Sequence, residues 1–357
     1  MQPDPRFWLN KRVCVTGGTG FLGWHIVSQL LALSAKVRVF GLPPRSTRLA
    51  SLLSSCDCMV GDVCDSDAVR KAIHGCDVVI HTAGPVAVWG PMLSRMREIH
   101  EVGTRNVLDA LPANARLVHT SSVVAVGASR GEESLHEDSP FPLGNLHVDY
   151  VHAKRNAETI ALAGAQAGRD VVIVNPAYLV GPEDYERSVM GRFCERFWKQ
   201  RLPLLPPGGL NFVDVRDVAT GHLLAAERGQ AGRRYILAGS NRTIGEFACE
   251  LAEVAALPRK WRPTLPAWCL SALALLLENW AKISKREPHP SCQYARLNWY
   301  NWFYESSCAR EELGFDARPL IETLADSYRW HCDEGIIVPR EKKSNSVSAD
   351  ANRRKAA

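Results

Sequence analysis

The sequence has no hydrophobic run long enough to cross a membrane. Hydrophobic residues make up 46% and charged residues 23% of the 357 residues, which is typical of a globular protein. The apolar stretch 265–277 is well short of the roughly 20 residues that a spanning helix needs. Residues 1–6 carry no apolar segment of the kind found in secretory signal peptides. We therefore expect a cytoplasmic protein without a spanning segment.

The sequence also lacks a strong charge excess and a metal-binding cysteine pattern. The formal net charge is +5, and part of the surplus lies in the tail 336–357, which we expect to be disordered. Nucleic acid is therefore not an expected partner. Among eleven cysteines only Cys56 and Cys58 are close in sequence, too few for a zinc site. Reduced thiols and no bound metal are expected.

What the sequence does have is an alternation of short apolar runs with helical patterns. This alternation predicts parallel strand–helix–strand units, and therefore an α/β fold with a Rossmann-type doubly wound parallel sheet. The expected strands are 12–16, 36–40, 58–60, 77–81, 116–120 and 170–174, and the expected helices are 21–33, 92–111 and 149–165.

The pattern loosens after residue 182, where prolines and glycines become frequent. We expect residues 1–182 to form a dinucleotide-binding Rossmann domain, rejoined by about 210–240 in a strand–helix–strand return to the sheet. Residues 183–209 and 241–335 are then expected to form a smaller, mostly helical substrate lobe at the carboxyl end of the sheet.

A glycine loop joins the first expected strand to the first expected helix. Gly17, Gly20 and Gly23 are spaced three residues apart. Glycine allows a tight turn, close approach to a pyrophosphate and close helix–strand packing, and the helix N-terminus attracts phosphate. A plain tight turn is the alternative, but the position at the first strand–helix junction favours a dinucleotide.

The second expected strand is followed by no acidic residue. NAD sites usually have Asp or Glu there to bind the ribose hydroxyls, whereas this chain has Arg45 and Arg48 shortly beyond the strand. This favours a 2′-phosphate and hence NADP, with NAD as the alternative and ordinary loop arginines as the neutral interpretation. Asp62, after the third strand, could bond the adenine amino group or act as a turn residue.

A tyrosine and a lysine share one face of an expected helix. Tyr150 and Lys154 are four residues apart. An ammonium beside a phenol is expected to lower the tyrosine pKa, so that the phenol can act as a general acid or base. Ser122 ends the fifth apolar strand, where a hydroxyl can hold a substrate oxygen. A surface pair and a strand-end cap are the structural alternatives.

Together these motifs resemble the extended short-chain dehydrogenase/reductase superfamily. That superfamily includes NAD-dependent epimerase/dehydratases, dihydroflavonol-reductase-like proteins and 3β-hydroxysteroid dehydrogenases, and the resemblance runs from about residue 11 to 335. Segments 174–182, 221–229 and 234–237 are similar to the hopanoid-associated sugar epimerase branch. The resemblance implies that Ser122, Tyr150 and Lys154 are catalytic. The cofactor-binding residues that it implies, with those named above, are Gly17, Thr19, Gly20, Phe21, Leu22, Gly23, Arg45, Asp62, Val63, His81, Ala83, Tyr150, Lys154, Pro176 and Ala177.

One position departs from the family pattern. The family usually has Asn where this chain has His100, which could be a second titrating group or a packed helix histidine.

Several functions stay open at this stage. Apolar segments 265–277 and 297–303 favour a flavonoid-, sterol- or lipid-like ketone, although they could equally form the core of the lobe or a homodimer interface. We expect an NAD(P)-dependent oxidoreductase acting on such a small molecule. The alternatives are a nucleotide-sugar epimerase or dehydratase with bound NAD, for which Arg187, Arg192 and Arg196 could bind a diphosphate, and a non-catalytic cofactor-binding regulator.

Overall fold

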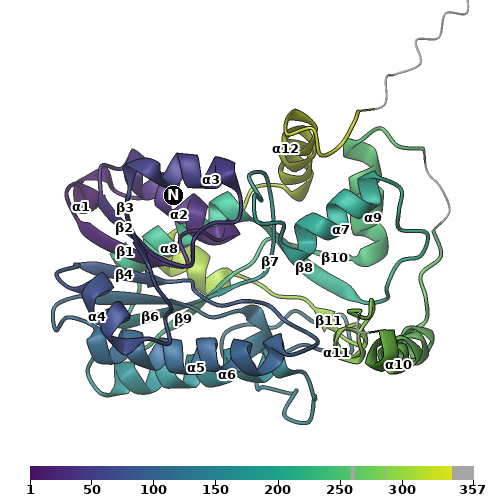
Figure 1. Ribbon diagram of the computed structural model, residues 1–357, viewed down its shortest axis with the longest axis horizontal. Coiled ribbons are helices and arrows are strands. Elements are labelled where there is room, and N and C mark those ends of the chain that lie inside the picture. The colour runs from purple at the N-terminus through teal and green to yellow at the C-terminus, as the bar shows by residue number, and fades with distance from the viewer. Residues whose placement is uncertain (259–261, 285, 340–357) are drawn as a thin grey trace, which may run out of the picture.

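A seven-stranded parallel sheet forms the centre of the computed structural model, which describes residues 1–258, 262–284 and 286–339 (Figure 1). The strands of this sheet are β1 (Arg12–Thr16), β2 (Lys36–Gly41), β3 (Asp57–Val60), β4 (Val78–His81), β5 (Arg116–Thr120), β6 (Val171–Pro176) and β9 (Arg234–Leu237). Their order is β3-β2-β1-β4-β5-β6-β9, and every neighbouring pair is parallel. The predicted Rossmann-type fold is therefore confirmed, and the strand order reverses between β1 and β4, where doubly wound folds bind ligands.

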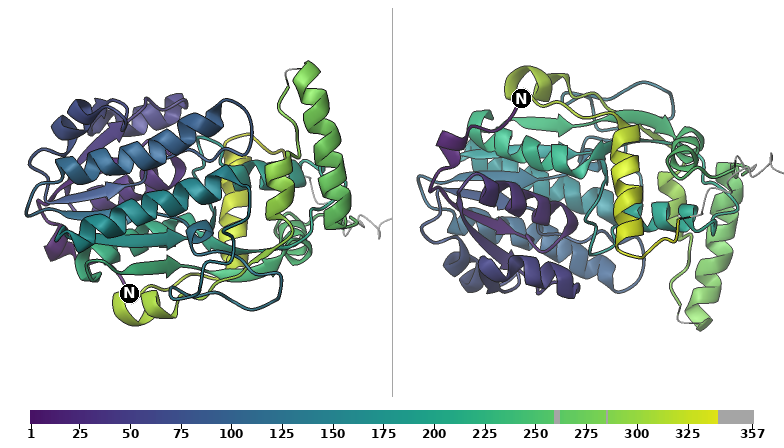
Figure 2. Two further views of the ribbon diagram at one scale, coloured as in Figure 1. Left: turned by 90° about the horizontal axis from the view of Figure 1, so that it is seen from below. Right: turned by 90° about the horizontal axis from the view of Figure 1, so that it is seen from above.

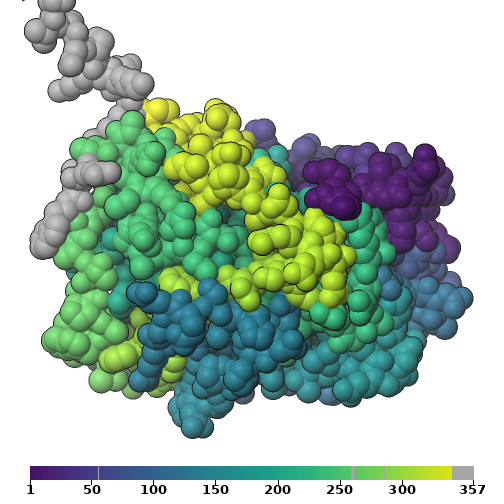
Figure 3. All heavy atoms as spheres, turned by 180° about the vertical axis from the view of Figure 1, so that it is seen from behind, coloured from purple at the N-terminus to yellow at the C-terminus, as the bar shows by residue number. Residues whose placement is uncertain are grey.

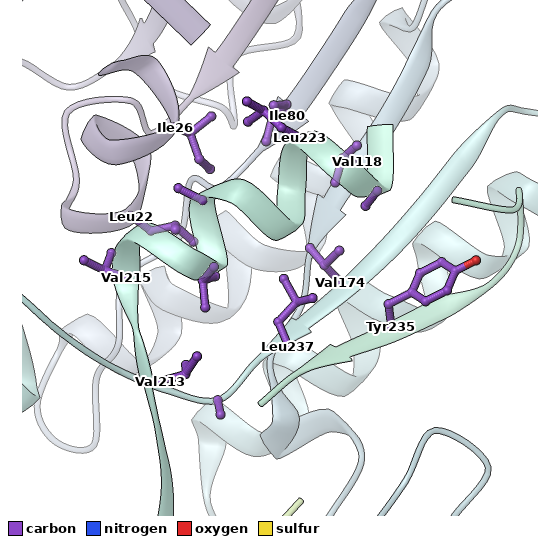
Figure 4. Packing of buried hydrophobic residues seen from close by; sticks show 14 of the residues in the cluster. Leu22, Ile26, Ile80, Val118, Val174, Val213, Val215, Leu223, Tyr235 and Leu237 are labelled. Atoms are coloured by element: carbon purple, nitrogen blue, oxygen red, sulfur yellow. The ribbon is translucent and has the colours of Figure 1, made fainter. Parts of the chain in front are cut away.

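Helices cover both faces of the sheet, which is why its strands are continuously apolar. One apolar core includes residues from α2 (Phe21–Ala32), α3 (Thr47–Leu52) and α8 (Val215–Arg228), and the other includes residues from α4 (Ser66–Ile73), α5 (Met92–Ala110) and α6 (Asp149–Gln166). Figure 4 shows α8 packing between α2 and the strands through residues such as Leu223 and Val174.

A short N-terminal helix, α1 (Pro5–Trp8), closes the edge of the first core. Trp8 is fully buried, and its indole nitrogen donates a 2.6 Å hydrogen bond to Glu227 of α8. The helix thereby joins two segments that lie far apart in the sequence.

A second, smaller sheet lies beyond the carboxyl ends of the central strands. Its central strand is β8 (Gly209–Asp214). Three strands pair with it, namely β7 (Tyr178–Val180), β10 (Ser240–Thr243) and β11 (Asn301–Trp302). The expectation that segment 210–240 returns to the central sheet as strand, helix and strand is therefore wrong for its first strand. The chain leaves the central sheet after Pro176, which has no N–H to donate, and β7 then provides a partner for β8.

Most of the remaining chain is helical, as expected. A third core joins the second sheet to α7 (Val189–Trp198), α9 (Ile244–Val254) and α12 (Leu320–Asp333), and α12 lies across one side of the molecule (Figures 2 and 3). The last pair, α10 (Ala267–Ser284) and α11 (Cys292–Leu297), stands at the end of the molecule away from β3 (Figure 2).

Two expectations about chain organisation are not settled by this arrangement. The division into a Rossmann domain and a substrate lobe stays a prediction. The expected disordered tail lies mostly in 340–357, outside the described residues. Within the described part of the chain, no helix is both long and apolar enough to span a membrane.

Candidate active site

The glycine loop between β1 and α2 contains two glycines that the fold itself requires. Gly17 has φ +71°, and a Cβ there would lie 2.8 Å from the Cα of Ala83. A Cβ on Gly23 would lie 2.1 Å from the carbonyl oxygen of Gly17, a distance that real atoms do not allow. These two positions hold the turn closed and let α2 begin directly beneath it.

Gly20 is different, because the fold leaves space beside it. A Cβ on Gly20 would meet one atom of the protein, the Gly17 carbonyl oxygen at 3.3 Å. Gly20 also occupies the N-cap of α2, where no side chain caps the helix. The free space and the uncapped N–H groups fit the phosphates of a dinucleotide, which bind at such helix N-termini.

The other residues expected around this loop are placed as follows. The Thr19 hydroxyl donates to the carbonyl of Leu42 at 3.0 Å, Phe21 packs edge-on against His25, and Leu22 is buried in the core. Thr19 and Phe21 are therefore half-buried, whereas Leu22 supports the loop from the core.

The His81 side chain is fully engaged inside the protein. Its Nδ1 lies 2.7 Å from the Thr16 hydroxyl and its Nε2 lies 3.4 Å from the Thr104 hydroxyl. Burial, with a smaller contribution from the charge of Lys154, lowers the pKa of His81 to about 3. The ring is thus a neutral core group. A cofactor contact at this position stays a prediction, and it would have to come from the backbone.

Asp62 forms an ion pair that the sequence did not suggest. Arg95 of α5 contacts its carboxylate, and the Cys64 amide donates to it at 2.9 Å. Burial opposes the charged form, but these contacts leave the pKa of Asp62 below its usual value. Val63, beside it, is buried against Gly103. The adenine contact expected of Asp62 would therefore involve an acid already paired with Arg95.

The loop after β2 lies close to the segment after β7. The amides of Arg45 and Ser46 both donate to Glu186, at 2.9 and 3.2 Å. Arg48 forms a 3.0 Å ion pair with Glu334, next to the end of α12. No ion pair of the Arg45 guanidinium occurs among the described residues, so Arg45 is the arginine of the two that remains available to an anion.

Ser122 and Tyr150 come together at the carboxyl end of β5. Ser122 follows the strand and accepts a hydrogen bond from the Val124 amide, and its side chain is hydrogen-bonded to the Tyr150 phenol. The neighbouring Ser121 hydroxyl is buried without a hydrogen-bond partner among the described residues. Ser122 is therefore the serine that can share a substrate oxygen with Tyr150.

Lys154 lies one helical turn after Tyr150 and is buried. Its ammonium donates to the Thr120 carbonyl at 3.0 Å. Burial lowers the pKa of Lys154 to about 8, and the nearby Glu158 acts in the opposite direction. Glu158 is itself held by Arg234 at 2.9 Å and Asn175 at 2.6 Å.

The expected lowering of the Tyr150 pKa does not occur in this structure. Burial raises the pKa of Tyr150 to about 12, and the hydrogen bond with Ser122 only partly offsets this. The cause is that Lys154 turns its ammonium to the Thr120 carbonyl, so desolvation dominates at the phenol. At neutral pH Tyr150 is therefore a protonated group, ready to donate.

His100 is a packed helix histidine. It is 2% exposed, its Nε2 lies 3.0 Å from the Pro85 carbonyl, and its ring fills the space beside Gly84. Burial, with a smaller contribution from the charge of Lys154, holds the pKa of His100 well below its usual value. Its ring centre nevertheless lies 6.1 Å from that of Tyr150, so it shapes one wall of the site.

The chain at the end of β6 carries the expected Pro176 and Ala177, and after them a tyrosine that sequence reasoning missed. Ala177, after Pro176, donates to the Leu237 carbonyl at 3.1 Å. The next residue, Tyr178, is close to Tyr150 and to Tyr294 of α11, since both phenols add to burial in raising its pKa. The position of Tyr178 at the end of β6 could have indicated it, whereas nothing in the sequence around Tyr294 did.

No cluster of metal-ligating side chains occurs among residues 1–258, 262–284 and 286–339. The groups that the structure brings together at this strand end are the Ser122 hydroxyl, the Tyr150 phenol and the Lys154 ammonium.

Such a site on a doubly wound sheet defines the extended short-chain dehydrogenase/reductase superfamily. The sequence pattern of the NAD dependent epimerase/dehydratase family matches residues 13–238, and this chain belongs to that family.

Relatives named for different reactions resemble the chain over almost its whole length. It is 33% identical to a Synechocystis protein named for dihydroflavonol 4-reductase, over 92% of this chain and 98% of the relative. It is 34% identical to the sterol demethylase protein B of Methylococcus capsulatus, over 90% and 99%. The crystal structure of gox2253 superposes with a TM-score of 0.80 at 28% identity, covering 92% of this chain and all of the other.

Proposed function

We propose that the protein is an NAD(P)-dependent oxidoreductase that interconverts a carbonyl and an alcohol on an apolar small molecule. The observation that carries this proposal is the meeting of Ser122, Tyr150 and buried Lys154 at the strand end beside the glycine loop. An intact set of this kind also speaks against a purely regulatory role.

The three side chains have separable roles in this chemistry. A bound nicotinamide dinucleotide supplies the hydride exchange with the substrate carbon. Ser122 hydrogen-bonds the oxygen on that carbon, and Tyr150 gives the oxygen a proton during reduction and takes it back during oxidation. Burial keeps the phenol protonated, so Tyr150 can supply the proton that reduction of a carbonyl requires.

Lys154 supports both partners of the reaction. Its ammonium is fixed by the Thr120 carbonyl, on the same helix face as the phenol. A cofactor ribose bound beside it would share this ammonium, and the positive charge would favour loss of the Tyr150 proton.

NADP is the proposed cofactor. The loop after β2 has no acidic residue of its own that follows the strand directly, and the Arg45 guanidinium is exposed and without an ion-pair partner in the described chain. Glu186 accepts hydrogen bonds from the Arg45 and Ser46 amides of this loop. We therefore expect a 2′-phosphate to bind at the Arg45 guanidinium, away from the Glu186 carboxylate.

The proposed substrate is a flavonoid-, sterol- or lipid-like ketone or alcohol. Two of the three arginines that could hold a sugar diphosphate are engaged, because Arg187 pairs with Glu195 at 3.5 Å and Arg192 donates to the Arg187 carbonyl. Relatives named for a flavonoid reductase and a sterol demethylase support an apolar substrate. The family match keeps a nucleotide-sugar epimerase with bound NAD as the second candidate.

One experiment separates the two candidates. The purified protein is denatured and its released cofactor identified, and fresh protein is then assayed for NADPH oxidation on apolar ketones and for conversion of nucleotide sugars. We expect weakly held cofactor and stoichiometric NADPH use with one class of ketone. Tightly retained NAD together with conversion of a nucleotide sugar, without net cofactor use, would establish the epimerase instead.

A further inference from the structure

Helix α10 presents an apolar face to solvent. Of its 18 residues, Leu270, Ala274 and Ala281 are buried, and the first two pack with Ala295 of the neighbouring α11. The outer side, which we call the α10 face, carries two tryptophans and four aliphatic residues that are all exposed: Trp268, Leu273, Leu275, Leu276, Trp280 and Ile283.

This face is too apolar for a helix that only meets water. Trp268, Leu276, Trp280 and Ile283 are 66%, 69%, 64% and 75% exposed, and they share one side at helical spacing. Contiguous exposed apolar patches of this kind mark interaction sites. Tryptophan in particular is favoured at the boundary between lipid and water, where its ring is buried and its N–H stays hydrated.

The charges around the α10 face are arranged for an anionic surface. Lys282, Arg286 and Glu287 are exposed at its C-terminal end, so these three described residues leave a net positive charge there. The acid of the helix, Glu278, is turned inward, where it accepts a 2.7 Å hydrogen bond from the Cys292 amide. An apolar face with a cationic edge is the pattern of helices that lie in the interface of an anionic bilayer.

Helix α10 is linked to the active-site region through α11, which packs on its inner side. From α11, next to α10, the Ser291 hydroxyl donates to the Val88 carbonyl at 3.0 Å, and Gln293 exchanges hydrogen bonds with Asp149, the residue before Tyr150. Tyr294 of the same helix is near Tyr178, whose pKa it helps to raise. A surface that seats α10 is therefore linked through α11 to the segment that carries Tyr150.

We propose that the α10 face docks on the headgroup surface of an anionic lipid bilayer, from which the enzyme takes its apolar substrate. With one side packed on α11, the helix lies along the bilayer and inserts only its outer side chains, over about 27 Å of helix length. The inference rests on the proposed function and adds that the apolar substrate is taken from the bilayer.

Flotation with lipid vesicles tests this proposal without any turnover. The full-length protein is mixed with vesicles of phosphatidylcholine and phosphatidylglycerol, or of phosphatidylcholine alone, and the fraction that floats is measured. We expect binding to the mixed vesicles, and a loss of at least about tenfold in partitioning for a Trp268→Ser, Trp280→Ser double variant. Lys282→Gln should weaken binding to the anionic vesicles by about fivefold and leave phosphatidylcholine binding unchanged.

A matched control and a second readout separate this inference from the proposed function. Leu9→Ser removes another exposed apolar side chain, 59% exposed and outside the α10 face, and should float like the unaltered protein. Both the double variant and the control should keep their melting temperature and their rate on a ketone dissolved in detergent-free buffer. Vesicle binding without any reductase activity would leave the docking intact and refute the function.

Three results would overturn the docking proposal. They are the absence of vesicle binding, equal flotation of the double variant and the unaltered protein, and a concentration-dependent dimer that the double variant abolishes. The last result would assign the α10 face to a second copy of the chain.

Discussion

Helices α2 and α10 are both rich in apolar residues, yet they use them in opposite ways. In α2 seven residues are buried, because α8 packs against one side and the sheet against the other. In α10 three residues are buried and six large apolar side chains are exposed to solvent. Apolar content therefore shows burial only where the fold supplies neighbours on more than one side. Where the fold leaves one side of an apolar helix without neighbours, the exposed apolar residues indicate a surface that binds a partner.

The largest expected effect concerns the N-terminus of α2, where we propose that the cofactor phosphates bind. Gly20→Val should abolish NADPH and NADH binding in a fluorescence titration, because the new side chain occupies the space left for the pyrophosphate. Folding should survive, since a Cβ there meets one atom at 3.3 Å. The matched variant Gly23→Ala should fail to fold, because its Cβ would lie 2.1 Å from a backbone oxygen. Equal binding by Gly20→Val would remove the phosphate assignment.

The next effect contrasts the site with the α10 face in turnover. Tyr150→Phe deletes the proton and keeps the ring, so turnover should fall by about 10²–10⁴-fold while cofactor affinity and melting temperature stay nearly unchanged. Lys154→Ala should lose both rate and cofactor affinity. Trp280→Ser should change neither on a dissolved substrate. Near-normal turnover by Tyr150→Phe would place the proton donor elsewhere, with His100 the first to test.

The two helices should differ most clearly in how much a leucine-to-alanine substitution lowers the free energy of unfolding. Leu30 of α2 is fully buried, and Leu30→Ala should lower the free energy of unfolding by about 2–5 kcal/mol. Leu276 of α10 is 69% exposed, and Leu276→Ala should change it by about 0.5 kcal/mol or less. Urea unfolding of both variants measures the difference. A large loss for Leu276→Ala would show that α10 is buried by an unseen neighbour in the isolated protein.

Buried histidines around the sheet should make stability depend on pH. Burial lowers the pKa of His222 to about 4, opposed by its hydrogen bond to the Val218 carbonyl, so the folded state keeps it neutral while the unfolded state takes up a proton below about 6.5. Stability is therefore present above pH 6.5 and falls as the pH drops towards 4, by about 1.4 kcal/mol per pH unit for each such histidine.

Urea unfolding between pH 4.5 and 7 measures this slope. His222→Leu should flatten it by the share of one histidine, although it also costs the hydrogen bond with Thr120. The exposed His74 offers a control, and His74→Gln should leave the slope unchanged. A slope that His222→Leu does not alter would mean that this histidine is charged or hydrated in the folded protein.

The smallest expected effect is the choice of cofactor. NADPH should bind about tenfold more tightly than NADH, the worth of roughly one exposed charge-assisted contact to Arg45. Arg45→Gln should remove the preference, whereas Arg48→Gln should not, because Arg48 is paired with Glu334. Equal or tighter NADH binding by the unaltered protein would contradict the NADP assignment.

Local patterns predicted the strands and the glycine loop because their physics is local. The expected strand 12–16 coincides with β1, and the expected helix from 149 coincides with the start of α6, where apolar periodicity and glycine spacing decide the structure. The meeting of Ser122 with Tyr150 also followed, because parallel strands bring their carboxyl ends to one edge.

The remaining differences depend on contacts that no local pattern contains. Strand β8 belongs to the second sheet because it pairs with β7, which continues beyond the central sheet. The two paired strands are some thirty residues apart in the sequence. Asp62 forms an ion pair with Arg95 of α5, and the Lys154 ammonium donates to the Thr120 carbonyl. Burial then raises the pKa of Tyr150, where a lowering was expected. Each outcome is a competition between long-range partners.

The hydrogen bond between Trp8 and Glu227 bears on how the chain is made. Its two residues are 219 positions apart, so at the usual rate of about 5–20 residues per second a ribosome needs roughly 11–44 s to produce the partner after the tryptophan. During that interval the edge of the first core lies open, with Trp8 available to chaperones. The N-terminal edge can thus be completed only after about two thirds of the 357 residues have been translated, although Trp8 is among the first to be made.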